Sequence, residues 1–176
     1  MTRFCQMLRH FRQNEDGTMV LPFTLWITIF LSLIVSTIEL GTMTIRQTVM
    51  ERAVDTAMRD LKIGKLPGDA ATLKAAICDG ASILPSCAEN LHLEMIRLDM
   101  EEWQQPAARA DCVDTGAVAT PHRTFQQGDA HEVMLVRACF KYKPITPLGG
   151  FNASLPKDEN GYTALVSSSA FVNEPL

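Results

Sequence analysis

The chain has 176 residues, of which 47% are hydrophobic, 20% charged and 7% aromatic, and its formal net charge is -4 at pH 7. This balance, together with the lack of any run of Lys or Arg, excludes a strongly basic surface that could follow a phosphate backbone. We therefore expect no nucleic-acid partner, and the length suffices for one modest domain.

Residues 1–17 form a short arm before the first apolar segment. The arm carries three arginines and ends in an acidic-glycine junction: Arg3, Arg9, Arg12, Glu15, Asp16 and Gly17. Positive charge beside a membrane span favours retention of that side in the cytoplasm. Because further arginines begin at Arg46, at a similar distance beyond the span, other evidence has to support the orientation.

Residues 20–40 (VLPFTLWITIFLSLIVSTIEL) contain a single ionisable side chain, Glu39. At about 1.5 Å per residue, a helix of this length covers roughly 30 Å, the thickness of the hydrocarbon core of a bilayer. The segment predicts one transmembrane helix within residues 18–41. A buried core helix is the alternative, which the lack of a polar face disfavours. The run also exceeds the apolar core of a secretory signal, and no small-residue cleavage site follows it.

Three residues of the span are candidates for membrane or assembly contacts: Pro22, Glu39 and Gly41. Pro22 fits the first turn of a helix and is expected to mark where the span begins. Glu39 lies at the far end, where its carboxylate is expected to reach water as a solvated anchor. Recognition of an assembly partner is the alternative role for Glu39.

Residues 42–65 change from uniformly apolar to amphipathic. Their apolar side chains follow the spacing of one helix face: Met50, Ala53, Val54, Ala57, Met58 and Leu61. No proline interrupts residues 23–62, so a helix that tolerates Gly41 would continue for about 60 Å from the membrane side. Gly64 and Pro67-Gly68 are expected to stop it. The apolar face needs a partner outside the bilayer, and residues 66–176 are available for this.

Residues 66–176 predict a short helix and about three strands. Asp69 is expected to cap a helix over residues 70–79. Strands are expected over residues 91–98, 132–142 and 162–172, separated by polar loops. In the second strand, one face holds Met134, Val136, Ala138, Phe140 and Tyr142, and the other, expected to be partly solvated, holds Val133, Leu135, Arg137, Cys139 and Lys141. In the last strand, one register holds Tyr162, Ala164, Val166, Ala170 and Val172.

Four of the five cysteines lie downstream of the span: Cys78, Cys87, Cys112 and Cys139. An even number suits two disulfides in an oxidising compartment. The spacing of Cys78 and Cys87 does not match that of zinc ligands, and no histidine pair stands near them. Of the three possible connectivities, we prefer the local one, Cys78 with Cys87 and Cys112 with Cys139. The arm is then cytoplasmic, and the domain is exported.

Sequence patterns that mark enzymes are missing. The chain has no phosphate-binding glycine loop, no G-x-S-x-G and no H-E-x-x-H, and its four histidines are scattered singly. The adjacent acids Glu101 and Glu102 lie in a polar loop with no second group of catalytic residues to support them. We expect no enzymatic activity, no cofactor, no metal and no small-molecule substrate.

The junction of Gly17 and Thr18 stands directly before the apolar run, as in a prepilin-type leader. Residues 3–41, from the Arg/Phe-rich arm to the closing Ile-Glu-Leu-Gly, resemble the amino terminus of the TadE/TadG-like proteins of tight-adherence (Tad, Flp-type) pilus systems. Residues 132–147 (EVMLVRACFKYKPITP) and 167–175 (SSSAFVNEP) resemble the smaller members of that family. One position departs from the pattern, because Pro22 stands where pilin-like spans carry a glutamate five residues after the glycine.

The resemblance implies a pilin-like member of the α+β class, with a long amino-terminal helix packed on a small antiparallel sheet. It implies a minor pseudopilin or assembly component of a tight-adherence type IV pilus, in the bacterial inner membrane with its domain in the periplasm. The implied partners are the lipid bilayer, other pilus assembly or pilin-like proteins, and a prepilin peptidase that cleaves between Gly17 and Thr18. A bitopic envelope scaffold or sensor unrelated to pili is the alternative.

Overall fold

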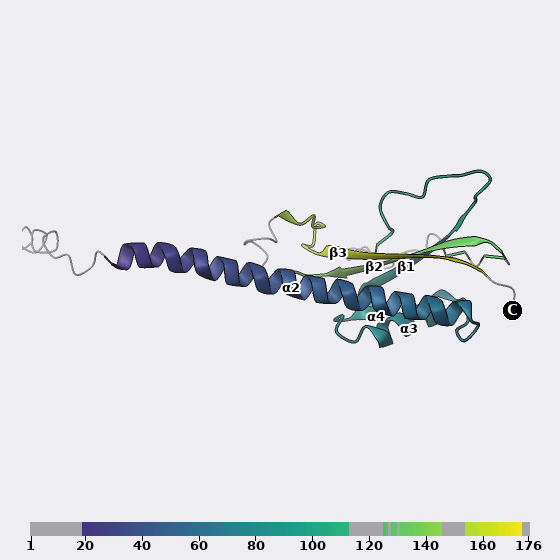
Figure 1. Ribbon diagram of the computed structural model, residues 1–176, viewed down its shortest axis with the longest axis horizontal. Helices are drawn as coiled ribbons and strands as arrows, with labels where there is room; N and C mark the ends of the chain where they lie inside the picture. Colours follow the sequence, from purple (N-terminus) through teal and green to yellow (C-terminus); the bar gives the residue numbers. More distant parts are fainter. Residues whose placement is uncertain (1–18, 113–124, 127, 130, 146–153, 174–176) are drawn as a thin grey trace, which may run out of the picture.

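The computed structural model describes residues 19–112, 125–126, 128–129, 131–145 and 154–173. These residues form an α+β arrangement of one long helix, two short helices and a small sheet (Figure 1). In chain order the elements are α2 (Val20–Lys62), α3 (Ala70–Gly80), α4 (Cys87–Asn90), β1 (Leu91–Leu98), β2 (Val133–Tyr142) and β3 (Thr163–Val172). The expected class and the expected strands are confirmed, whereas α4 was not predicted.

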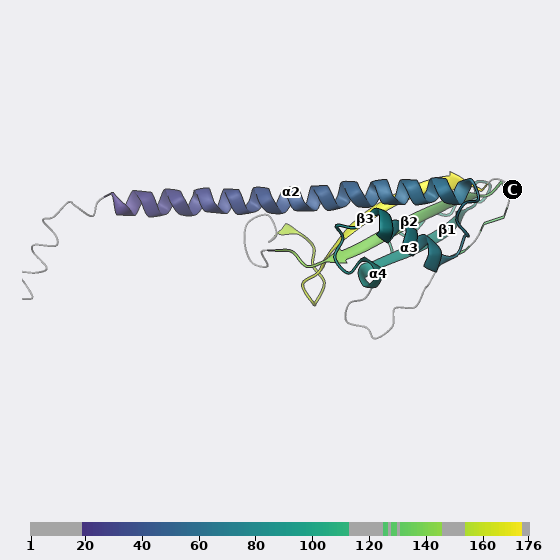
Figure 2. The same cartoon turned by 90° about the horizontal axis from the view of Figure 1, so that it is seen from below.

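Helix α2 is continuous through Gly41 and runs for 43 residues. Its first half projects away from the rest of the chain, and its second half lies along the sheet (Figures 1 and 2). The helix ends where the sequence predicts, because Gly64 adopts a φ of 71° and donates its N–H to the carbonyl oxygen of Leu61 at 3.1 Å. A left-handed glycine at this position satisfies a free carbonyl of the last turn.

The sheet has the order β1-β2-β3, and both strand pairs are antiparallel. Leu93 faces Ala138 across the first pair, and Ala138 faces Ser167 across the second. One face of the sheet packs against α2 and α3, so the molecule outside the projecting helix has two layers. Asp69 caps α3 as expected, since its carboxylate accepts the N–H of Thr72 at 2.9 Å.

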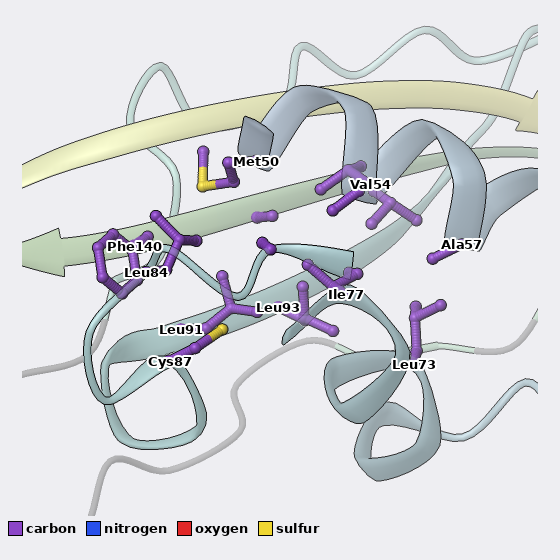
Figure 3. Close-up of a cluster of buried hydrophobic side chains, with 14 of the residues drawn as sticks. Met50, Val54, Ala57, Leu73, Ile77, Leu84, Cys87, Leu91, Leu93 and Phe140 are labelled. Atoms are coloured by element: carbon purple, nitrogen blue, oxygen red, sulfur yellow. The ribbon is translucent and has the colours of Figure 1, made fainter. Parts of the chain in front are cut away.

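A single core joins α2, α3 and the sheet (Figure 3). Its fully buried side chains include the following: Met50, Val54, Leu73, Ile77, Leu91, Met134, Val136 and Phe140. The predicted apolar faces of α2 and β2 therefore meet in one place. Residues 50–58 of the long helix belong to the same packed unit as the downstream domain, which ties the position of the span to the position of the sheet.

The register named for the last strand lies on the face away from the core. Thr163, Leu165 and Ser167 point into the core, whereas Ala164 and Val166 are exposed. The pairing with β2 decides this, because Leu165 lies opposite the buried Phe140 and Ser167 opposite the buried Ala138. Adjacent residues of a strand point to opposite faces, so a choice of register moves every side chain of the strand.

The second face of β2 is also less solvated than expected. Arg137 and Cys139 are buried, at 7% and 0% exposure. The cause is the segment of residues 99–112, which crosses this face and is tied to it by the disulfide between Cys112 and Cys139. His92 and Glu94 of β1 are buried on the same face for the same reason.

Candidate functional site

The first half of α2 is the most apolar surface in the described part of the chain. Its most apolar 18-residue window has a mean hydropathy of 2.0, and none of it is buried against the domain. A core helix of a soluble protein would bury such a face, so this exposure indicates a single-pass membrane protein. The threonine hydroxyls in the segment are satisfied locally, as Thr24 and Thr28 donate to the carbonyls of Leu21 and Thr24 at 2.9 and 2.6 Å.

Glu39 is not the solvated anchor expected from the sequence. Its side chain is 6% exposed, and its Oε1 accepts the backbone N–H of Ile145 at 2.9 Å. Ile145 lies in the connection from β2 to β3, so the carboxylate fastens this connection to the end of the span. The solvated interpretation is corrected, because a distant segment reaches the carboxylate and covers it.

Two turns further along α2, Arg46 contacts Tyr142 of β2. The Arg46 guanidinium carbon lies 5.0 Å from the centre of the Tyr142 ring. Burial raises the pKa of Tyr142, while the charge of Arg46 acts in the opposite direction and that of Glu39 adds to the increase. Glu39 and Arg46 thus hold opposite ends of the same short stretch of chain, from Tyr142 to Ile145.

The other candidate positions of the span differ in what the structure places around them. Pro22 lies in the first turn of α2. Backbone N–H groups in this turn have no acceptor within the helix, so a proline, which lacks this group, costs no hydrogen bond there. Gly41 lies inside the helix, and a Cβ added there would have no atom within 4 Å. No contact among the described residues therefore requires a glycine at this position. The candidate junction of Gly17 and Thr18 lies outside the described residues.

Two disulfides fix the domain. Cys78 at the end of α3 is bonded to Cys87 at the start of α4, with 5.6 Å between the Cα atoms. Cys112 is bonded to Cys139 of β2, with 5.3 Å between the Cα atoms. This is the local connectivity preferred from the sequence, and two disulfides indicate an oxidising compartment for residues 70–173.

A polar cluster joins the sheet to the segment of residues 99–112, and we call its four residues, His92, Glu94, Asp111 and Arg137, the outer-face cluster. The three residues of the sheet are buried, and Asp111, which belongs to the segment, is partly exposed. Nε and Nη2 of Arg137 lie 2.9 and 2.7 Å from Oε2 of Glu94, which also accepts the N–H of Asp111 at 3.2 Å. Nε2 of His92 lies 3.5 Å from Oδ2 of Asp111. Sequence reasoning missed this cluster, although Glu94 and Arg137 lie directly opposite each other on paired strands.

The outer-face cluster has the features of a structural network. Its charges are opposite and adjacent, and the segment over it is held by the Cys112–Cys139 disulfide and by a hydrogen bond from Arg137 to the carbonyl oxygen of Ala107. Burying an ion pair is compensated only when its geometry is good and further hydrogen bonds support it. Here Nη2 of Arg137 has its ion pair with Glu94, while neither Nη2 nor the buried Oδ2 of Asp111 makes a hydrogen bond among the described residues. The arrangement fixes the segment of residues 99–112 on the sheet.

One cavity of about 490 Å³ opens beside the end of α2, far from the span. Its lining combines the turn after α2 with the sheet: Leu61, Gly64, Lys65, Leu66, Pro67, Gly68, Met95, Gly128, Met134, Phe171 and Asn173. Lys65 is the one ionisable side chain in this lining. Among the described residues, no group of three or more His, Cys, Asp or Glu is placed to hold a metal ion.

No protein-family model, curated protein or solved structure matches this chain. Its function therefore has to be argued from the geometry. The geometry combines an apolar rod suited to lipid with a rigid, disulfide-bonded domain built on the continuation of the same rod.

Proposed function

We propose that this chain is a minor pseudopilin or assembly component of a tight-adherence type IV pilus. In this proposal it acts by protein–protein contact, at the inner membrane through the span and in the periplasm through the domain. It performs no chemistry and needs no cofactor.

The continuity of α2 is the observation that carries the proposal. One unbroken 43-residue helix supplies both the exposed apolar half and, through Met50, Val54 and Ala57, the centre of the domain core. Its length is about 65 Å at 1.5 Å per residue, roughly twice the hydrocarbon core of a bilayer. A rod of this kind transmits the position of the span in the membrane to the domain, which suits a subunit that packs beside other helical rods.

Two further features support the pilus assignment. The sequences of both ends of the chain resemble TadE/TadG-like proteins, and the two disulfides suit a periplasmic domain.

One feature favours the alternative, a bitopic scaffold or sensor unrelated to pili. Pro22 replaces the glutamate that would pair with a new amino terminus in the membrane, and such pairing offsets a charge in lipid.

Deletion and copurification separate these two functions. A strain that lacks the chain should lose surface pili and adherence, and a plasmid copy should restore both. The full-length protein, cross-linked in membranes before extraction, should bring down inner-membrane components of the pilus machinery. Normal pili in the deletion strain, with no pilus component captured, would overturn the pilus assignment and favour the scaffold or sensor.

Processing of the arm gives a second test of the same proposal. Cleavage by a prepilin peptidase would make Thr18 the first residue, and intact mass of the membrane-extracted protein measures the loss of residues 1–17. A Gly17→Leu variant is the matched control, because its bulky side chain alters only the junction. Retention of the arm in both proteins would make the chain a permanent anchor.

A further inference from the structure

The apolar surface of α2 continues past Glu39, which lies near the end of the predicted span. Beyond Glu39, the side chains of Leu40 and Ile45 are exposed on α2, and Arg46 is the next charged residue. Ile145, fastened to Glu39 by its backbone N–H, has a side chain that is 60% exposed. Lys143, two residues earlier in the same connection, is also exposed. We call Leu40, Ile45, Lys143 and Ile145 the membrane-proximal tip.

We propose that the membrane-proximal tip lies within the headgroup layer of the bilayer, so that Ile145 makes a second lipid contact beside the span. The occupant of this surface is lipid, with anionic headgroups favoured near Lys143. The proposal rests on the membrane span and is independent of the assignment to a pilus.

The length of the uncharged rod supports this placement. Between Val20 and Ile45, Glu39 is the single ionisable residue, and a helix over this range measures about 39 Å at 1.5 Å per residue. The hydrocarbon core accounts for roughly 30 Å, and about 9 Å is then left for the headgroup layer on the side of the domain. A bilayer surrounds a span on all sides, so Ile145, held at the level of Glu39, enters the same layer.

The contact between Glu39 and Ile145 makes this depth tolerable for a carboxylate. A charged group near the acyl chains is unfavourable unless it is paired or hydrogen-bonded. Here the carboxylate is buried by the protein itself and accepts a backbone N–H at 2.9 Å. The lipid therefore meets the apolar side chain of Ile145, and the charge of Glu39 stays covered.

The charges around the tip suit a lipid surface. The long apolar stem of a lysine lies along the interface while its ammonium group reaches the headgroups, as the exposed Lys143 can do. One acid of the same connection, Asp158, binds Lys141, with 2.9 Å between Oδ2 and Nζ. The other nearby cation, Arg46, lies over the Tyr142 ring at the outer limit of the tip.

A fluorescent probe at position 145 tests the proposal in the purified full-length protein. The Cys5→Ser, Ile145→Cys protein, with both disulfides intact, is labelled with bimane and reconstituted in phosphatidylcholine vesicles, with and without phosphatidylglycerol. Val172→Cys is the matched control, because Val172 is exposed on β3 and lies near Arg59 and Lys62, at the end of α2 far from the span.

Lipids that carry a nitroxide near the headgroup should quench the probe at position 145 about threefold more than the probe at position 172, as expected for a side chain at the interface. Aqueous iodide should show the opposite order, and phosphatidylglycerol should strengthen the lipid quenching at position 145. Equal lipid quenching at both positions, with full access of iodide to position 145, would overturn the proposal. Since no pilus component is present, this outcome would leave the proposed function untouched.

Discussion

At the scale of single residues, Glu39 connects the membrane half of the chain to the domain. Its partner, Ile145, is 106 positions away in the sequence, and no local pattern indicates this contact. Sequence reasoning could place Glu39 at the end of the span but could not identify what covers it. Similarly, the preferred bond between Cys112 and Cys139 predicted a polar loop tied across the outer face of the second strand, while the burial of Arg137 and its pairing with Glu94 depend on tertiary structure.

The Glu39 contact can be tested by hydrogen exchange. Glu39→Ala removes the acceptor, so the amide of Ile145 should exchange faster, with a loss of about 1–2 kcal/mol of local protection. Glu39→Gln keeps a carbonyl oxygen at the same reach and should preserve most of the protection. Mass spectrometry of the peptide that contains Lys143 and Ile145 measures the difference. Unchanged exchange in the alanine variant would show that the hydrogen bond does not hold this connection.

The outer-face cluster gives a second prediction at this scale. Arg137→Met leaves the carboxylate of Glu94 buried without its ion pair and should lower the free energy of unfolding by about 3–5 kcal/mol. In the double variant, Glu94→Leu with Arg137→Met, the unpaired charge is gone and most of the stability should return. Chemical unfolding followed by circular dichroism measures both. A double variant less stable than the single Arg137→Met variant would refute this account of the pair.

Tyr142 predicts a dependence of stability on alkaline pH. Burial raises the pKa of its phenol above the ordinary value of 10.0, which means that folding favours the neutral ring. The stabilisation is present below pH 10 and is lost as the pH rises through the raised pKa in the folded state. The unfolding temperature should fall over this range in the native protein, and less steeply in Tyr142→Phe, which cannot ionise. Parallel curves for the two proteins would contradict the prediction.

At the scale of elements, periodicity predicted where α2, α3 and the three strands lie, because the positions of apolar side chains repeat within each of them, whereas the single turn of α4 is too short to show a period. The bounds of β1 agree with the expected range of residues 91–98. The orientation of β3 could not be obtained in this way. Its sequence TALVSSSAFV has small or apolar residues in both registers, and the pairing of Leu165 with Phe140 selects the inner face.

Gly41 allows the role of α2 in assembly to be separated from its role in folding. Gly41→Ala should stabilise the helix by about 0.5–1 kcal/mol, since alanine restricts the unfolded chain and the added Cβ meets no atom within 4 Å. Gly80→Ala is the matched control, because a Cβ there would lie 3.2 Å from that of Ala53 and should bring no such gain. Thermal unfolding in detergent measures both. If the Gly41→Ala protein is stable but a strain that carries it no longer adheres, a partner helix is packed at this glycine.

At the scale of the whole molecule, one part of the chain is suited to lipid and the other to water, and the unbroken helix α2 runs through both. Lipid suits the first half of the helix, and the core of the domain begins at Met50. The disulfide between Cys112 and Cys139 spans 27 positions, and a loop of this length is worth about 3–4 kcal/mol in the chain-entropy account. The domain thus has its own core and its own cross-links on one side of the membrane.

It follows that residues 42–176 should fold without the span. This fragment keeps Met50, Val54 and the rest of the core, so we expect a protein that is soluble without detergent and unfolds cooperatively. The full-length chain should require detergent, because the exposed surface of residues 20–38 is apolar. Met50→Asp in the fragment is the control that should abolish folding, since Met50 is fully buried. The opposite result would be an insoluble fragment and a full-length chain that is soluble without detergent. It would show that the first half of α2 packs on protein rather than on lipid.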